Sequence, residues 1–170
     1  SGIEHRMEKV GTFRGIPFYN DCIATIPHAV ECAVEALKNV DTLIFGGMDR
    51  GLDYSEFENY LKKSNIKNLI GTPETGRKIC DKIEGAPQKT VYKAANLDEA
   101  VKKAYEVTEK GKICLLSPLQ AITATKTLRK KASITKSLSA NTEKKIKHRK
   151  LERLRRSRLL TLQGFKKAEK

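Results

Sequence analysis

The stretch Thr42-Leu43-Ile44-Phe45-Gly46-Gly47-Met48-Asp49-Arg50-Gly51 joins a short apolar run to a glycine-rich loop. A second stretch has the same form, since the apolar run Ile16–Tyr19 leads into the polar loop Asn20–Pro27. Each loop is followed by residues with helical periodicity. In an open α/β sheet, loops that lead from strands into helices lie at the carboxyl ends of the strands, where ligands are usually held. We therefore expect residues 20–27 and 46–51 to form the functional edge of an α/β domain.

The rest of the chain up to Pro118 repeats this alternation of strands and helices. The expected strands are 7–13, 16–19, 42–45, 67–70, 90–92 and 112–116. The expected helices are 27–37, a helix opening at 53, 75–83 and 97–107. A turn at Arg14-Gly15 makes the first two strands a β-hairpin. Strands separated by helices of about ten residues form right-handed βα units, so the pattern predicts a Rossmann-like three-layer α/β domain with a mostly parallel sheet, opened by a hairpin.

Charge divides the chain into two parts. The net charge of the 170 residues is +14, which by itself would favour a nucleic-acid partner. From Leu119 onward there are 17 Lys and Arg against 3 Asp and Glu, whereas residues 1–118 carry 17 of each sign. We therefore divide the chain into a neutral domain, 1–118, and a basic, largely irregular or helical tail, 119–170. The tail has little apolar surface with which to fold; a disordered or frameshifted segment is the favoured interpretation, and binding to nucleic-acid phosphates or to an anionic membrane surface are the alternatives.

The cysteines predict a reducing compartment. Four are scattered without a C-x-x-C pair. Cys32, Cys80 and Cys114 lie in apolar segments and are expected to be buried, whereas Cys22 lies in the first loop. No His, Cys and Asp residues have metal-ligand spacing, no Ser/His/Asp set is recognisable, and no apolar run is long enough to span a membrane.

Five segments, in order and spacing, resemble the C-terminal domain of Mur ligases, most nearly the glutamate-adding members. They are His5–Glu8, Tyr19–Pro27, Gly46–Gly51, Asp53-Tyr54 and Leu115–Pro118. The resemblance covers residues 3–118. It implies a three-domain cytoplasmic enzyme that uses ATP and Mg²⁺, held mainly by domains absent from this chain, to convert the carboxylate of UDP-MurNAc-L-alanine into an acyl phosphate, which the amine of glutamate attacks. A chain detached from those domains is expected to be inactive.

The resemblance also implies roles for four residues. Arg6 and Asp21 match nucleotide-binding positions, while Thr25 and Arg50 match positions that contact glutamate; no catalytic residue or metal ligand is implied here. A guanidinium holds carboxylate or phosphate oxygens bidentately, and helix N-termini after both loops favour anions. From the residues alone, helix capping by Asp21 and Thr25 and a solvated Arg50 remain alternatives.

Two departures from the family pattern affect this interpretation. Ile23 and Cys22 stand where a lysine and a serine are commoner, which leaves open D- or L-glutamate addition, and another amide-bond ligase of the same fold, such as a polyglutamate-adding one, is an alternative. After Pro118 the family's phenylalanine-containing motif is missing. Because Thr127–Thr135 can be encoded by DNA whose neighbouring frame reads that motif, we hypothesise a frameshift, which the gene sequence would test.

Gly71–Lys78 nearly matches the phosphate-binding pattern G-x-x-x-x-G-K-[ST]. Arg77 stands where the pattern requires Lys, and Lys78 replaces the Mg²⁺-binding hydroxyl. We therefore interpret this stretch as a helix-starting turn.

Overall fold

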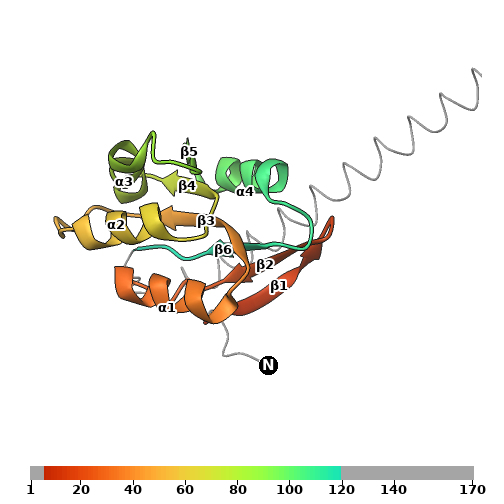
Figure 1. Ribbon diagram of the computed structural model, residues 1–170. Coiled ribbons are helices and arrows are strands. Elements are labelled where there is room, and N and C mark those ends of the chain that lie inside the picture. Colours follow the sequence, from red (N-terminus) through yellow and green to blue (C-terminus); the bar gives the residue numbers. More distant parts are fainter. Residues whose placement is uncertain (1–5, 120–170) are drawn as a thin grey trace, which may run out of the picture.

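The computed structural model describes residues 6–119, which form a mixed sheet with helices on both faces (Figure 1). The strands are β1 (Glu8–Phe13), β2 (Ile16–Asn20), β3 (Val40–Gly46), β4 (Asn68–Thr72), β5 (Thr90–Lys93) and β6 (Ile113–Leu116). The helices are α1 (Pro27–Leu37), α2 (Ser55–Lys63), α3 (Thr75–Ile83) and α4 (Leu97–Val107). Each expected element is present, and α1, α3 and α4 have the expected bounds.

The strand order is β1-β2-β6-β3-β4-β5. Strands β2, β6, β3, β4 and β5 run parallel to one another, and β1 pairs with β2 as an antiparallel hairpin. This arrangement confirms the predicted α/β fold with a mostly parallel sheet opened by a hairpin. Because β6 lies between β2 and β3, the end of the last strand separates the two loops.

Two apolar cores lie on opposite faces of the sheet, because successive side chains of a strand point to opposite sides. Leu43 and Phe45 of β3 belong to the core that packs against α1, α2 and α3. Ile44 belongs to the second core, which α4 covers with Ala100, Val101, Ala104 and Tyr105. Strands buried on both faces read as continuous apolar runs, which explains the Thr42–Phe45 pattern.

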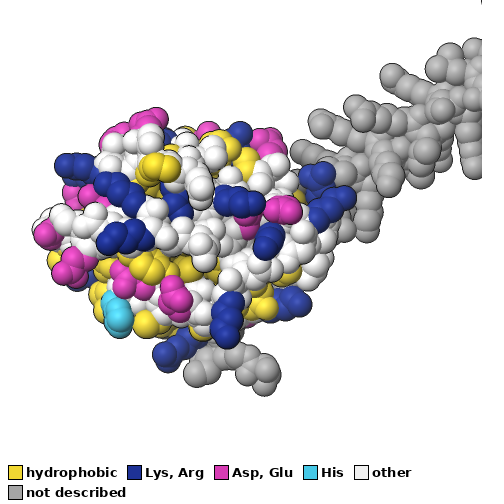
Figure 2. Space-filling model, viewed as in Figure 1, with side chains coloured by type: hydrophobic (Ala, Val, Ile, Leu, Met, Phe, Trp, Pro, Cys, Tyr) yellow, Lys and Arg dark blue, Asp and Glu magenta, His cyan; other side chains and the backbone are white. Residues whose placement is uncertain are grey.

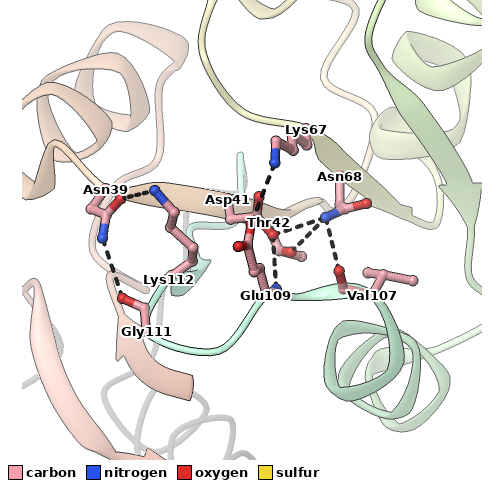
Figure 3. Close-up of polar contacts among 9 residues, drawn as sticks. All are labelled: Asn39, Asp41, Thr42, Lys67, Asn68, Val107, Glu109, Gly111 and Lys112. Carbon is pink, nitrogen blue, oxygen red and sulfur yellow. Dashed lines mark hydrogen bonds and ion pairs between the residues drawn. The ribbon is translucent and has the colours of Figure 1, made fainter. Parts of the chain in front are cut away.

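A buried polar network ties the amino ends of β3 and β4 to the end of α4 (Figure 3). The amide nitrogen of Asn68 donates to Asp41 Oδ2 at 3.1 Å, to Thr42 Oγ1 at 3.3 Å and to the Val107 carbonyl at 3.3 Å. Asp41 Oδ2 also accepts the backbone N–H of Glu109 at 3.2 Å. This network lies at the sheet edge opposite the two loops, so it anchors the domain without entering the candidate site.

Two cysteines are placed differently from the expectation. Cys32 is exposed, so its predicted burial is wrong, and Cys22 is buried although it lies in the first loop, whereas Cys80 and Cys114 are buried as predicted. The buried side chains of α1 are Val30, Ala33 and Val34, and Cys32 projects from the helix away from them.

The surface of the described domain carries both signs of charge, and Figure 2 shows basic and acidic side chains interspersed over the face in view. Among residues 6–119, no helix combines the length and apolar character needed to cross a bilayer. His5 and the tail from residue 120 lie outside the described residues, so the predictions of disorder, frameshift and nucleic-acid binding for the tail stay predictions.

Candidate functional site

The two loops lie at the carboxyl edge of the sheet, on either side of the segment that leaves β6. The Asp21 N–H donates to the Leu116 carbonyl at 2.8 Å, at the first loop. On the other side, the N–H groups of Ser117 and Leu119 donate to the carbonyls of Ile44 and Gly46 at 3.0 and 2.9 Å. Ser117–Leu119 therefore bridges the two loops, and the buried Leu119 packs with the domain.

Asp21 is a buried acid whose carboxylate accepts two hydrogen bonds. Asp21 is only 4% exposed to solvent. Its Oδ1 accepts the Met7 N–H at 3.1 Å, and its Oδ2 accepts the Ser117 hydroxyl at 3.3 Å. Burial raises the pKa of Asp21, while these two donors and the nearby Arg6 charge oppose the rise. The carboxylate is thus held in one orientation, with a guanidinium beside it.

Arg6 and Asp21 share a groove that runs along the first loop and α1. This α1 groove has a volume of about 560 Å³. Its lining comprises Arg6, Met7, Asp21, Ile23, Ala24, Ile26, His28, Ala29, Cys32, Ala33 and Ala36. The exposed Arg6 supplies a cation to a largely apolar concavity of ligand size, so the structure brings together the two residues predicted to meet a nucleotide.

Thr25 is half-buried in the first loop. Helix α1 begins at Pro27, its N-cap is Ile26, and no side chain accepts a capping hydrogen bond there. The alternative in which Asp21 or Thr25 caps α1 is therefore wrong. Proline is tolerated in the first turn because it has no backbone N–H that needs a partner. The Asp21 carboxylate instead accepts hydrogen bonds from Met7 and Ser117.

Arg50 is exposed at the tip of the second loop, beside Gly51, whose φ of 66° is left-handed. The neighbouring Asp49 is tied to α3, because it pairs with Lys78 and its N–H donates to Glu74 Oε2 at 3.2 Å. The Lys78 hydrogen bond lowers the pKa of Asp49. The loop thus rests on α3 while Arg50 stays open to solvent, and Arg50 does not line the α1 groove.

The glycines of the P-loop-like stretch bring backbones together. A Cβ at Gly71 would lie 2.4 Å from the Gly76 carbonyl oxygen, and one at Gly76 would lie 2.5 Å from that of Phe45. The Gly47 carbonyl accepts the N–H groups of Glu74 and Thr75 at 2.6 and 2.9 Å. Helix α3 begins here, at Thr75, which confirms the predicted helix-starting turn, and both glycines are needed for close packing.

Two contributors, Ser117 and Lys78, were not predicted from the sequence to belong to the site. Ser117 holds Asp21, and its only sequence signal is its place in the Leu115–Pro118 segment. Lys78 supports the second loop from a helix 29 residues further along the chain than Asp49, and no local pattern marks such a contact. Among the described residues, no group of His, Cys, Asp and Glu is arranged to hold a metal ion.

The family described as Mur ligase, glutamate ligase domain, matches residues 5–119. This chain belongs to that family. The match covers the two loops, the buried Asp21 and the segment that leaves β6.

Relatives with two glutamate specificities match the same region. The chain is 42% identical over 119 residues to the UDP-N-acetylmuramoylalanine–D-glutamate ligase of Caldanaerobacter subterraneus, covering 69% of this chain and 26% of that protein. It is 36% identical over 118 residues to the UDP-N-acetylmuramoyl-L-alanine–L-glutamate ligase of Salinispora tropica, with the same coverage of both. The chain thus spans about a quarter of the length of the curated relatives it matches.

Solved structures share the fold at low identity. A MurF ligase from Thermotoga maritima, in complex with ADP, has a TM-score of 0.56 at 15% identity, covering 83% of this chain and 32% of that one. A bifunctional folylpolyglutamate synthase/dihydrofolate synthase from Yersinia pestis has a TM-score of 0.57 at 13% identity, covering 81% and 31%. These likenesses support the architecture alone.

Proposed function

We propose that this domain is the ATP- and amino-acid-facing part of a ligase that adds glutamate to UDP-MurNAc-L-alanine in peptidoglycan synthesis. The observation that carries the proposal is the 42% identity over 119 residues to a glutamate-adding ligase. The location proposed with it is cytoplasmic. The remaining partners are the substrate-binding and central domains that correspond to the rest of such a ligase.

The nucleotide role assigned to Arg6 and Asp21 fits the α1 groove. Arg6 would hold phosphate oxygens, because a guanidinium carries a permanent charge and a planar fork of donors. Asp21 would orient groups at the base of the groove, since Met7 and Ser117 fix its carboxylate. ATP, with Mg²⁺, supplies the phosphoryl group that activates the acid to be joined. The glycines at 71 and 76 pack against neighbouring backbone, so this P-loop-like stretch is not free to cradle phosphates. We therefore assign most of the nucleotide site to another domain.

Arg50 and Thr25 are proposed to meet glutamate. Arg50 lies exposed on a loop whose neighbouring residue is braced by Lys78, so its guanidinium can bind a carboxylate bidentately without reordering the loop. Relatives that bear D- and L-glutamate names both match this region, and Ile23, which stands where a lysine is commoner, lies between Asp21 and Thr25. D-glutamate and L-glutamate are therefore the two alternative substrates that the experiment below distinguishes.

A chimera tests the proposal. Residues 1–119 would replace the matching C-terminal region of the Caldanaerobacter subterraneus enzyme. Phosphate release would be measured with ATP, UDP-MurNAc-L-alanine and either D- or L-glutamate. The expected result is release that requires one glutamate isomer. A folded chimera without glutamate-dependent release would contradict the proposal.

Variants of the chimera separate the role of Arg50 from a general effect of charge. Arg50→Ala is expected to raise the KM for glutamate at least about tenfold, which corresponds to about 1.4 kcal/mol of lost binding. Lys62→Ala is the matched control, since Lys62 is also an exposed cation but lies on α2. Equal KM values for the two variants would remove Arg50 from the glutamate site.

A further inference from the structure

An exposed cysteine on α1 lies against a histidine and a glutamate on the same helix. Cys32 Sγ is 3.7 Å from His28 Nε2, and His28 Nδ1 is 3.5 Å from Glu31 Oε2. The spacings i, i+3 and i+4 place the three side chains on one helical face. The order thiol, imidazole, carboxylate is that of an activated nucleophile, in which the base is oriented by a third group. We call these three residues the α1 triad.

The other thiols of the domain are closed to solvent. Cys22 and Cys80 are 0% exposed and Cys114 is 1% exposed. Burial raises the pKa of the Cys80 thiol to about 12 and also raises that of Cys114. A thiol reacts as its thiolate, so these groups are unreactive in the folded domain. Among the cysteines of the described residues, Cys32 alone is exposed, and its thiol lies beside the imidazole of His28.

The α1 groove gives Cys32 room for an adduct. Its wall along the helix consists of small side chains, Ala29, Ala33 and Ala36, next to Cys32 itself. The volume of about 560 Å³ is within the range of small-ligand sites. Arg6 provides a cation in the same groove, which favours an electrophile that carries carboxylates.

We propose that Cys32 is a modification site that forms mixed disulfides with small, anionic disulfides. His28 Nε2 takes the Sγ proton, and Glu31 stabilises the resulting imidazolium. The thiolate attacks one sulfur of the small disulfide, so a Cys32 S–S bond forms as the original S–S bond breaks. The leaving thiolate takes the proton from His28. The small disulfide is the oxidant, and one of its two halves stays on Cys32 while the other departs as a thiol.

The consequence for ligation depends on the proposed function, whereas the modification itself does not. An adduct on Cys32 would occupy the groove that Arg6 and Asp21 line, and would therefore compete with a ligand held there. The titratable groups around the α1 triad are Glu35 on the same helix, Tyr60 of α2, which donates to Glu35 Oε1 at 3.1 Å, and Arg6 and Asp21 in the groove.

The test uses the native 170-residue chain and 5,5′-dithiobis(2-nitrobenzoate), a small disulfide with two carboxylates. Release of the coloured thiol gives the rate, and mass spectrometry of peptides locates the adduct. The expected adduct is on Cys32, because its exposed thiol should react before the three buried thiols. Cys32→Ser is expected to abolish this fast phase of the reaction. His28→Gln is expected to slow the reaction about tenfold at pH 7, because the thiol loses the base beside it.

Glu35→Gln is the matched control, because Glu35 is a carboxylate on α1 that bonds Tyr60. Its rate is expected to match that of the unchanged chain, whereas Glu31→Gln is expected to slow the reaction. The proposal is overturned if the fast adduct lies on another cysteine, if no thiol reacts in the native chain, or if His28→Gln leaves the rate unchanged.

Discussion

The contact of α3 with β3 and β4 makes one substitution, Gly76→Ala, particularly informative. Gly76 lies in the first turn of α3. Its added Cβ would lie 2.5 Å from the Phe45 carbonyl oxygen, 2.9 Å from Gly71 Cα and 3.0 Å from Gly46 Cα. All three neighbours are backbone atoms, so a side-chain rotation cannot relieve the overlap. The helix would have to move away from the sheet.

Two effects of opposite sign decide the result. Helix propensity alone would make Ala more stable than Gly by about 1 kcal/mol. Overpacking a tight contact costs about 1–3 kcal/mol, and the upper end applies because the obstructing atoms are backbone. We therefore expect the free energy of unfolding to fall by about 2 kcal/mol. With a urea m-value of about 2 kcal/mol/M, the unfolding midpoint should fall by about 1 M.

Urea unfolding followed by far-UV circular dichroism would measure this change. Gly85→Ala is the control, because a Cβ there meets nothing within 4 Å although φ is 82°. It isolates the cost of the left-handed conformation, about 1 kcal/mol. A Gly76→Ala midpoint equal to or above that of the unchanged chain would refute the packing explanation and reopen the phosphate-loop interpretation of this stretch.

Three further predictions concern buried polar groups. Asn68→Ala removes the donor that joins Asp41 to the end of α4 and should lower the free energy of unfolding by about 1–3 kcal/mol, measured by urea unfolding; an unchanged midpoint would show that the network contributes no stability. The buried hydroxyl of Tyr54 has no hydrogen-bond partner among the described residues, so Tyr54→Phe should leave the melting temperature unchanged or raise it, and a fall would reveal a partner. Burial raises the pKa of Asp21 above its ordinary 3.8. Between pH 3.8 and this raised pKa, the folded chain keeps a proton on Asp21 that the unfolded chain has lost. The free energy of unfolding therefore falls as the pH rises through this range. Asp21→Asn should therefore be more stable than the unchanged chain at pH 7, with the difference vanishing below pH 3.8; a difference that does not depend on pH would contradict the role of ionisation.

Periodicity predicted the helices well because their apolar faces are local. In α4, Ala104 lies one turn after Ala100 and Val101, and the three are buried together, so sequence spacing alone identifies the buried face. The sheet strands were recognised for a similar reason, as continuous apolar runs are typical of parallel strands covered on both faces. Their ends were less accurate: Val40 and Asp41 belong to β3 although the prediction began at Thr42, because Val40 pairs with Ile113 of β6.

The cysteines show where local reasoning fails. Cys32 lies among the apolar residues of α1 in sequence, but only its direction from the helix axis decides that it is exposed. Cys22 is in a loop, yet its Sγ donates to Asn20 Oδ1 at 2.7 Å inside the domain. Burial depends on how a segment is oriented against its neighbours, and that orientation is set by distant contacts.

The loops at 20–27 and 46–51 were identified from sequence alone, because an apolar strand followed by a polar or glycine-rich turn and a helix is a local signal. The family was also readable in the order and spacing of five short segments. Only the tertiary structure showed that Ser117–Leu119 bridges the loops, that Lys78 braces Asp49, and that Arg6 and Asp21 share a groove. These relations join residues far apart in the chain, and they exist only because parallel strands bring their carboxyl ends to one edge of the sheet.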